Sequence, residues 1–189
     1  SPRRLSPRRT HMPRTGFHDL MDYDEKHSSS LDSYIRRGVY MSQKYDGWRM
    51  YWDGEKAYSR SGKKVVHCLP PHWVSALKAA GDVTLDGEIY LDGLPLGYVA
   101  TLWSAKCTEL VKLLWKWAVY LVFDVPSHGH LPFSERIKIG EAACKRIKDA
   151  WGGDNSHIQF IPQKYTTSPS VVEKYFQKVT LGPRNCAAL

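Results

Sequence analysis

Lys44-Tyr45-Asp46-Gly47-Trp48-Arg49 sets a lysine at the start of a tight turn, with an acid and an arginine close behind it. A lysine amine becomes a nucleophile only after it loses its proton, which burial and neighbouring cations both promote. Gly47 lets the backbone approach a bulky ligand, and the Arg49 guanidinium offers paired donors to a phosphate or carboxylate. The same residues also fit a β-hairpin whose Asp-Gly turn carries solvated charges, so the rest of the chain has to distinguish the two interpretations.

Further segments follow this lysine in a fixed order. They are Ser59-Arg60-Ser61-Gly62, Leu85-Asp86-Gly87-Glu88-Ile89-Tyr90 and Tyr120-Leu121-Val122-Phe123-Asp124, with Tyr51-Trp52-Asp53-Gly54 directly after the lysine segment. As a set they resemble the nucleotidyltransferase motifs of ATP-dependent DNA ligases, and they look most like the small, minimal ligases first described in bacteria and viruses. The resemblance covers roughly residues 38 to 181, and its specificity comes from the order of the motifs, since each motif alone is short.

The resemblance implies a covalent role for one residue and supporting roles beside it. Lys44 would attack the α-phosphate of ATP through its side-chain nitrogen, release pyrophosphate and keep AMP as a phosphoramidate. Asp46 would help to position that lysine, and Ser42 would belong to the ATP-binding set. Arg49 and Arg60 would hold phosphate and ribose groups, since a planar guanidinium gives both charge and direction.

Two residues from the later segments would complete the ATP site. Glu88 would bind the ribose or a divalent metal ion, because a carboxylate at a strand end can do either. Phe123 would lie against the adenine ring and contribute apolar area and stacking. Taken singly, Glu88 and Asp124 also fit exposed acids at strand ends, and Phe123 fits an ordinary core aromatic. The order of the segments favours the site.

The activity that the resemblance implies is ATP-dependent ligation of DNA. It uses ATP and Mg²⁺ to seal 5′-phosphate nicks in double-stranded DNA, as replication, repair and recombination require. The resemblance also implies that the protein is a monomer without a membrane partner. It further implies an intracellular location, in the nucleus or a DNA-containing organelle. Two alternatives stay open: an RNA ligase or RNA guanylyltransferase with the same lysine chemistry, and a catalytically inactive module that binds nucleotide and DNA.

Composition limits the chain to one substantial core. The 189 residues are 42% hydrophobic and include seven Trp, which suits one compact domain with a tail. The longest apolar run, residues 110–125, is broken by Lys112, Lys116 and Asp124. No segment is therefore apolar enough over a sufficient length to span a bilayer.

Residues that commonly bind metal or form cross-links show no site-like spacing. The four cysteines are far apart in the sequence: Cys68, Cys107, Cys144 and Cys186. Without a C-x-x-C pair we expect reduced thiols, and neither a zinc site nor disulfides. The histidines also lack a metal-ligand spacing. We expect Trp103, Trp115 and Trp117 to pack in the core rather than to contact DNA.

Positive charge is concentrated at the N-terminus. Residues 1–14 hold five arginines and no acid, so they account for five of the net charge of +8. This tail repeats Ser-Pro-Arg-Arg and lacks periodic apolar residues, which predicts disorder. Nonspecific phosphate contact, organelle targeting and a solvated tail are all open interpretations.

The apolar pattern predicts a mixed α/β (α+β) domain. Strands are expected at 39–43, 49–52, 56–59, 83–90, 118–123 and 158–163, and helices at 71–80, 103–114, 132–150 and 168–178. We expect two antiparallel sheets with flanking helices around a nucleotide groove. That architecture matches the ATP-grasp-like nucleotidyltransferase domain that the resemblance implies.

The C-terminal sequence departs from the ligase pattern. An E-G-hydrophobic-x-x-R strand would be expected near Leu181, followed by a K-x-K motif and an OB-fold domain, but the sequence there continues as residues 182–189 without them. We therefore expect an adenylation domain truncated before its last motifs, with impaired activity and no OB-fold domain. The expected divisions are a basic tail at 1–33, the adenylation domain at 34–181 and a divergent end at 182–189.

Overall fold

A five-stranded sheet and a two-stranded ribbon organise residues 28–152 and 157–181, the part of the chain that the computed structural model describes. The strands are β1 (Val39–Met41), β2 (Trp48–Trp52), β3 (Ala57–Ser59), β4 (Leu85–Leu91), β5 (Ala118–Asp124), β6 (Ile158–Phe160) and β7 (Lys164–Thr166). The helices are α1 (Ser28–Ile35), α2 (Pro71–Lys78), α3 (Leu96–Thr101), α4 (Glu109–Trp115), α5 (Phe133–Trp151) and α6 (Pro169–Leu181), with a short 3-10 turn, η2 (Pro126–His128).

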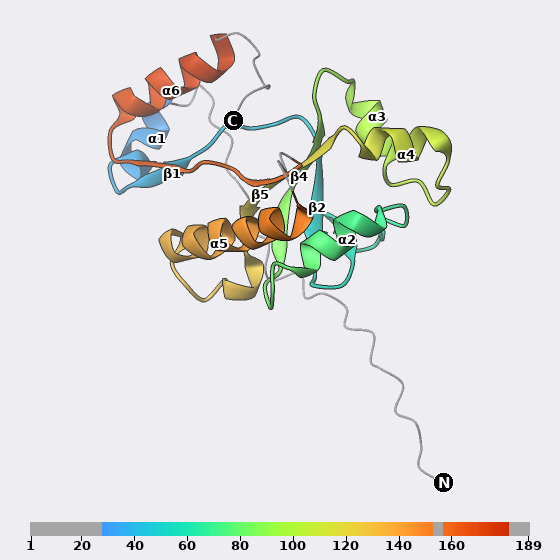
Figure 1. The fold of residues 1–189 in the computed structure, drawn as a ribbon. Coiled ribbons are helices and arrows are strands. Elements are labelled where there is room, and N and C mark those ends of the chain that lie inside the picture. Colours follow the sequence, from blue (N-terminus) through green and yellow to red (C-terminus); the bar gives the residue numbers. More distant parts are fainter. Residues whose placement is uncertain (1–27, 153–156, 182–189) are drawn as a thin grey trace.

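The large sheet has the order β3-β2-β4-β5-β6, and β1 pairs with β7 in the separate ribbon. Figure 1 shows α2 and α5 on one face of the large sheet, α1 and α6 beside the ribbon, and α3 with α4 at the other end. The expected mixture of two sheets and helices is confirmed. The prediction that both sheets are antiparallel is wrong for one pair, because β6 runs parallel to β5. The helix α5 connects these two strands and returns the chain to the starting end of β5.

The main core lies between the large sheet and the helices α2 and α5. Among its fully buried side chains are Trp52 on β2, Trp73 on α2 and Ile147 on α5. Tyr120 on β5 is also fully buried, and its hydroxyl lies 3.0 Å from two backbone carbonyl oxygens, those of Met50 and Leu85. The Tyr120 hydroxyl is therefore buried with two hydrogen-bond partners, as a buried polar group requires.

The expected strands and three of the expected helices appear close to their predicted positions. The helix expected at 103–114 is confirmed only in its second half: the chain forms α3 earlier, after Pro95, and α4 begins after Thr108. The Thr108 side chain accepts a hydrogen bond from the Val111 backbone N–H, so it caps α4 and sets its start. The helix α1 and the strand β7 were not predicted, and α1 begins ahead of the domain start expected at residue 34.

The tryptophans that were expected to pack in the core divide into two groups. Trp103 and Trp115 are buried, which confirms the expectation for both. Trp117 is 68% exposed, so the expectation is wrong for this residue. It lies one residue beyond the C-cap of α4, whose buried residues are Val111, Leu114 and Trp115. No helix within residues 28–152 and 157–181 has the length and apolar character needed to cross a membrane.

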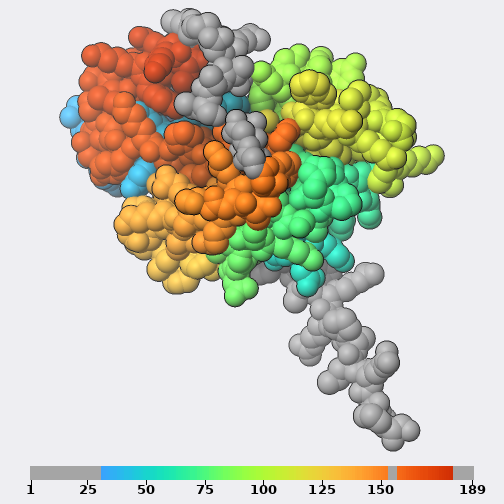
Figure 2. Space-filling model, viewed as in Figure 1, coloured from blue at the N-terminus to red at the C-terminus, as the bar shows by residue number. Residues whose placement is uncertain are grey.

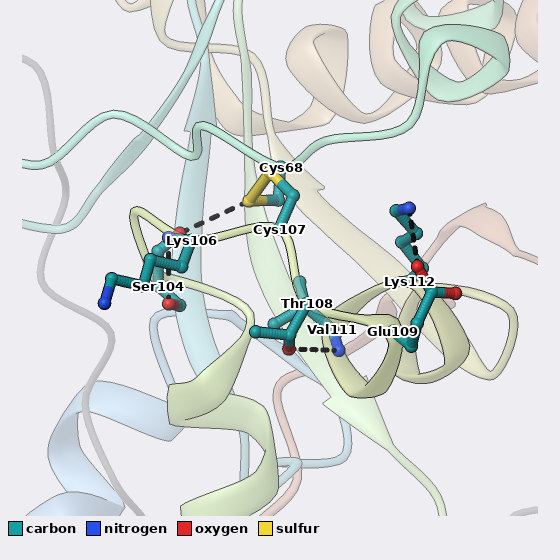
Figure 3. The surroundings of a disulfide bond; sticks show 8 residues. All are labelled: Cys68, Ser104, Lys106, Cys107, Thr108, Glu109, Val111 and Lys112. Carbon is teal, nitrogen blue, oxygen red and sulfur yellow. Dashed lines mark hydrogen bonds and ion pairs between the residues drawn. A yellow bond between two sulfur atoms is a disulfide. The ribbon is translucent and has the colours of Figure 1, made fainter.

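A disulfide joins Cys68 to Cys107, which corrects the expectation of reduced thiols (Figure 3). Cys68 lies in the loop between β3 and α2, and Cys107 lies just ahead of α4. Their Cα atoms are 5.3 Å apart although 39 positions separate them in the sequence. Because the two cysteines are so far apart in the sequence, their spacing could not predict the disulfide. Cys144 remains a free, buried thiol, and Cys186 lies outside the described residues.

Opening this disulfide should lower the stability of the fold. The cross-link closes a long loop, so it reduces the conformational entropy of the unfolded chain and stabilises the protein by about 2–4 kcal/mol. Cys68→Ser/Cys107→Ser should lose that amount in urea denaturation, and the parent protein in reducing buffer should lose a similar amount. Cys144→Ser in oxidising buffer is the control for thiol removal. Identical denaturation curves for the oxidised and reduced parent would contradict the expectation.

Candidate active site

The second face of the large sheet carries polar side chains from its central strands. Strand side chains alternate between faces, so Arg49 on β2 and Glu88 on β4, which are ladder partners, point to the same side, away from the main core. The β5 partner of Glu88 is Leu121. The apolar part of this face contains Leu121, Phe123 and Ile161, with Tyr45, Tyr90 and Val119 packed against them.

Phe123 occupies an irregularity in the ladder between β4 and β5. Asp86 pairs with Asp124 and Gly87 pairs with Val122, so β5 has one residue more than β4 at this point, and that residue is Phe123. Leu121 and Phe123 belong to the apolar cluster of this face, whereas Val122 between them belongs to the main core. Phe123 therefore keeps the regular alternation of β5 despite the irregular pairing.

Arg49 connects residues of three strands. Its Nε donates to Oδ1 of Asp86 at 2.9 Å, and its Nη2 donates to Oδ2 at 2.5 Å. The two side chains are 10% and 1% exposed, so a nearly buried, two-bonded ion pair holds the guanidinium in place. The guanidinium carbon also lies 5.3 Å from the centre of the Phe123 ring. Burial raises the pKa of Asp86, and Arg49 opposes that rise.

Glu88 and Gly47 are in close contact. A Cβ added to Gly47 would lie 2.8 Å from Cγ of Glu88 and 2.2 Å from the carbonyl oxygen of Ile89. Glycine is therefore required where this turn crosses β4. Burial raises the pKa of Glu88 to about 7, while the Arg49 charge and a hydrogen bond from the Gly47 backbone act in the opposite direction.

The raised pKa of Glu88 predicts a stability difference that depends on pH. Between pH 4.5 and about 7 the folded chain keeps a proton on Glu88 that the unfolded chain has lost, so stability falls as pH rises through this window. Glu88→Gln has no proton to lose there. Its free energy of unfolding relative to the parent should rise from pH 5 to 7 and level off above 7, as measured by urea denaturation at each pH. A constant difference across that range would contradict the raised pKa.

Lys44 lies between β1 and β2 and is exposed, whereas Gln43 and Tyr45 on either side are half-buried. The neighbouring Tyr45 ring packs edge-on against Tyr90 at 5.4 Å, which holds this segment against β4. Ser42 lies in the same segment and is half-buried. Arg60 is exposed in the turn after β3, and β2 separates β3 from β4. Three expected ATP-binding residues therefore lie outside β2, β4 and β5, on segments next to the sheet face that carries Arg49 and Glu88. They are Ser42, Lys44 and Arg60.

Sequence reasoning assigned no role to several residues of this face. Asp86 holds Arg49, and Tyr90 holds the lysine segment through Tyr45. Side chains alternate along β4, so Asp86 and Tyr90 lie on the same side as Glu88. This alternation alone could have predicted that both residues belong to the face that carries Glu88. Asp124 is buried rather than exposed at a strand end.

The residues of this face suit a metal ion only together with a phosphate ligand. Within the described ranges no group of three or more His, Cys, Asp or Glu side chains could hold a metal ion. Mg²⁺ commonly takes one or two carboxylates and completes its shell with water and substrate phosphates. Glu88 offers one such carboxylate on the shared face, so the donor chemistry fits a magnesium nucleotide.

Comparison of the sequence with known protein families and with curated proteins finds no match. Comparison with solved structures finds DNA ligases, so the chain has an ATP-dependent DNA ligase-like fold. One is a structure from a study of Lig E DNA ligases and of DNA binding with a minimal scaffold, at 23% identity and a TM-score of 0.55. It is matched over 78% of this chain and 52% of that chain.

Two further structures share the fold. The ATP-dependent DNA ligase from bacteriophage T7 in complex with ATP has 13% identity and a TM-score of 0.53, over 81% of this chain and 56% of that chain. The structure named Pmar-Lig_PreS3 has 16% identity and a TM-score of 0.57, over 82% of this chain and 37% of that chain. The chain therefore spans about half the length of the first two structures and less of the third.

Proposed function

We propose that this chain is the adenylation domain of an ATP-dependent DNA ligase of the minimal type. The observation that carries the proposal is the contact between separate segments on one sheet face, where Arg49 meets Asp86 and Phe123. Gly47 approaches Glu88 on the same face. A hairpin with solvated charges does not need these contacts. The similarity to solved DNA ligases supports the same class of protein.

In the proposed reaction the unprotonated Nζ of Lys44 attacks the α-phosphorus of ATP. A nitrogen–phosphorus bond forms, and the bond from that phosphorus to the leaving oxygen of pyrophosphate breaks. Glu88 holds the ribose or Mg²⁺, and the metal, when bound, neutralises phosphate charge. Phe123 stacks on adenine, and Arg49, Arg60 and Ser42 hold the rest of the nucleotide.

The later steps of the proposed reaction take place on nicked double-stranded DNA. AMP passes from the lysine to the 5′-phosphate of the nick, and the 3′-hydroxyl then attacks that phosphate and releases AMP. Arg49 and Arg60 suit this chemistry because guanidinium groups match the geometry of phosphate oxygens. The proposed working form is a monomer.

Labelling with radioactive nucleotide tests the proposal directly. The chain is incubated with Mg²⁺ and ATP or GTP labelled in the α-phosphate, then separated by denaturing electrophoresis. A covalent label from ATP supports the proposal. A label from GTP alone indicates a guanylyltransferase. Nucleotide binding in calorimetry without any covalent label indicates a binding module that does no ligation.

Phe123→Ala should weaken binding of a non-hydrolysable ATP analogue by about 1–3 kcal/mol, the usual contribution of a base–aromatic stack. Phe123 is largely buried, so the variant also needs a control for packing loss. Val122→Ala provides it, because Val122 is the preceding residue on β5 and belongs to the main core. Calorimetry that gives equal affinities for Phe123→Ala and Val122→Ala would place Phe123 in the core without a ligand role.

A further inference from the structure

The disulfide brings two lysine-bearing segments of the chain together. One is residues 63–68, which ends at Cys68, and the other is residues 104–117, which includes Cys107 and α4. The Cys68 sulfur lies 3.4 Å from the carbonyl oxygen of Ser104, so the segments are in contact beside the cross-link (Figure 3). They come from opposite sides of β4 in the sequence, and only the fold makes them neighbours.

Exposed lysines dominate the charge of these two segments. They are Lys63, Lys64, Lys106, Lys112 and Lys116. Glu109 is the one acid in either segment, and it accepts a hydrogen bond from Lys112 at 2.8 Å. The two segments therefore carry a net charge of 5 − 1 = +4, and we call the exposed surface that they form the lysine surface.

Chain lengths bound the size of the lysine surface. Lys63 is five residues from Cys68, which an extended chain spans in at most about 18 Å. Lys116 is nine residues beyond Cys107, at most about 18 Å when the two positions ahead of α4 are extended and the rest are helical. With the 5.3 Å between the Cys68 and Cys107 Cα atoms, the backbone of the surface spans at most about 41 Å, a little more than one turn of duplex DNA, about 34 Å.

An exposed aromatic residue adds to the lysine surface. Trp117 follows Lys116 directly and is 68% exposed. Figure 2 shows the region of α3 and α4, in light green to yellow, protruding from the body of the molecule. Lysines with a neighbouring exposed aromatic ring are typical of surfaces that bind a polynucleotide through its phosphates.

We propose that the lysine surface is a second contact area for DNA, separate from the candidate active site, which binds the phosphate backbone. The nature of the partner rests on the proposed ligase function, and the charge of the surface supports the same partner. Backbone contacts of this kind position a protein on DNA without reading its sequence. The disulfide holds the two segments in one arrangement before binding, which reduces the entropy lost on association.

A charge-matched pair of variants tests the proposal. Lys63→Ala/Lys64→Ala/Lys106→Ala/Lys116→Ala removes four charges from the lysine surface. Lys78→Ala/Lys138→Ala/Lys145→Ala/Lys148→Ala removes four charges from exposed positions on α2 and α5. Binding of each full chain to a fluorescent nicked duplex is measured by anisotropy over a range of salt concentrations.

The lysine-surface variant should bind at least about tenfold more weakly at low salt, and its slope of log affinity against log salt should fall in magnitude by about 3–4. The control variant should keep the parent slope. Equal slopes for the two variants would overturn the proposal. So would parent binding to vesicles containing phosphatidylserine without binding to the duplex, since the surface would then suit a membrane.

Two further measurements separate this inference from the proposed function. The lysine-surface variant should keep the parent level of covalent ATP labelling, because none of its four lysines is in the proposed ATP site. Loss of labelling with unchanged DNA binding would overturn the inference. Cys68→Ser/Cys107→Ser should bind DNA more weakly with a nearly unchanged salt slope, and affinity equal to the parent would overturn the role given to the disulfide.

Discussion

Lys44→Ala is expected to abolish covalent labelling by ATP completely. The proposed bond forms at the side-chain nitrogen of Lys44, and alanine leaves no nucleophile at that position. Lys44 also lies on the segment that Tyr45 holds against β4, close in sequence to Gly47 and its contact with Glu88. The measurement is denaturing electrophoresis after incubation with labelled ATP and Mg²⁺.

The matched control is Lys56→Ala, which removes another exposed lysine near the sheet. It should leave the label unchanged. A non-hydrolysable ATP analogue should still bind Lys44→Ala in calorimetry, because the aromatic and carboxylate groups of the proposed site remain. Persistent covalent label on Lys44→Ala would show that another residue is the nucleophile and would remove the central residue of the proposed mechanism.

Local sequence patterns were sufficient to predict the strands that carry the proposed site. Alternation and β-rich composition placed β2, β4 and β5 within one or two residues of their observed bounds. They did not reveal that Arg49 pairs with Asp86, since this contact depends on the register between two strands. They also did not reveal the bulge at Phe123, which depends on the pairing of β4 with β5.

The missed disulfide results from a long-range contact, and the misplaced helix from a local signal. Cys68 and Cys107 are far apart in the sequence, and only the fold brings their loops together. The helix expected at 103–114 was placed too early, because residues 104–108 form a loop and Thr108 caps α4. A capping threonine directly ahead of an apolar run is a local signal, and it was available in the sequence.

Two ion pairs near the start of α5 differ in burial and offer a controlled comparison. Arg136 donates from Nε to Oδ1 of Asp124 at 2.7 Å and from Nη2 to Oδ2 at 3.3 Å, and both side chains are under 10% exposed. Arg136 also donates to the Leu131 carbonyl oxygen at 2.9 Å. Lys138, two residues further along the helix, pairs with Glu135, and both of these side chains are largely exposed.

Arg136→Ala should lower the free energy of unfolding by about 3–5 kcal/mol, because it leaves the Asp124 carboxylate buried without its cation. Lys138→Ala should change it by at most about 1 kcal/mol, since solvent already screens the exposed pair. Arg136→Met/Asp124→Leu should recover part of the loss, because it removes both buried charges and keeps apolar volume. Urea denaturation of the four proteins measures all of these differences. If Arg136→Ala were no more destabilising than Lys138→Ala, the buried pair would not be what fixes α5 to the end of β5, and the position of Asp124 beside Asp86 would need another cause.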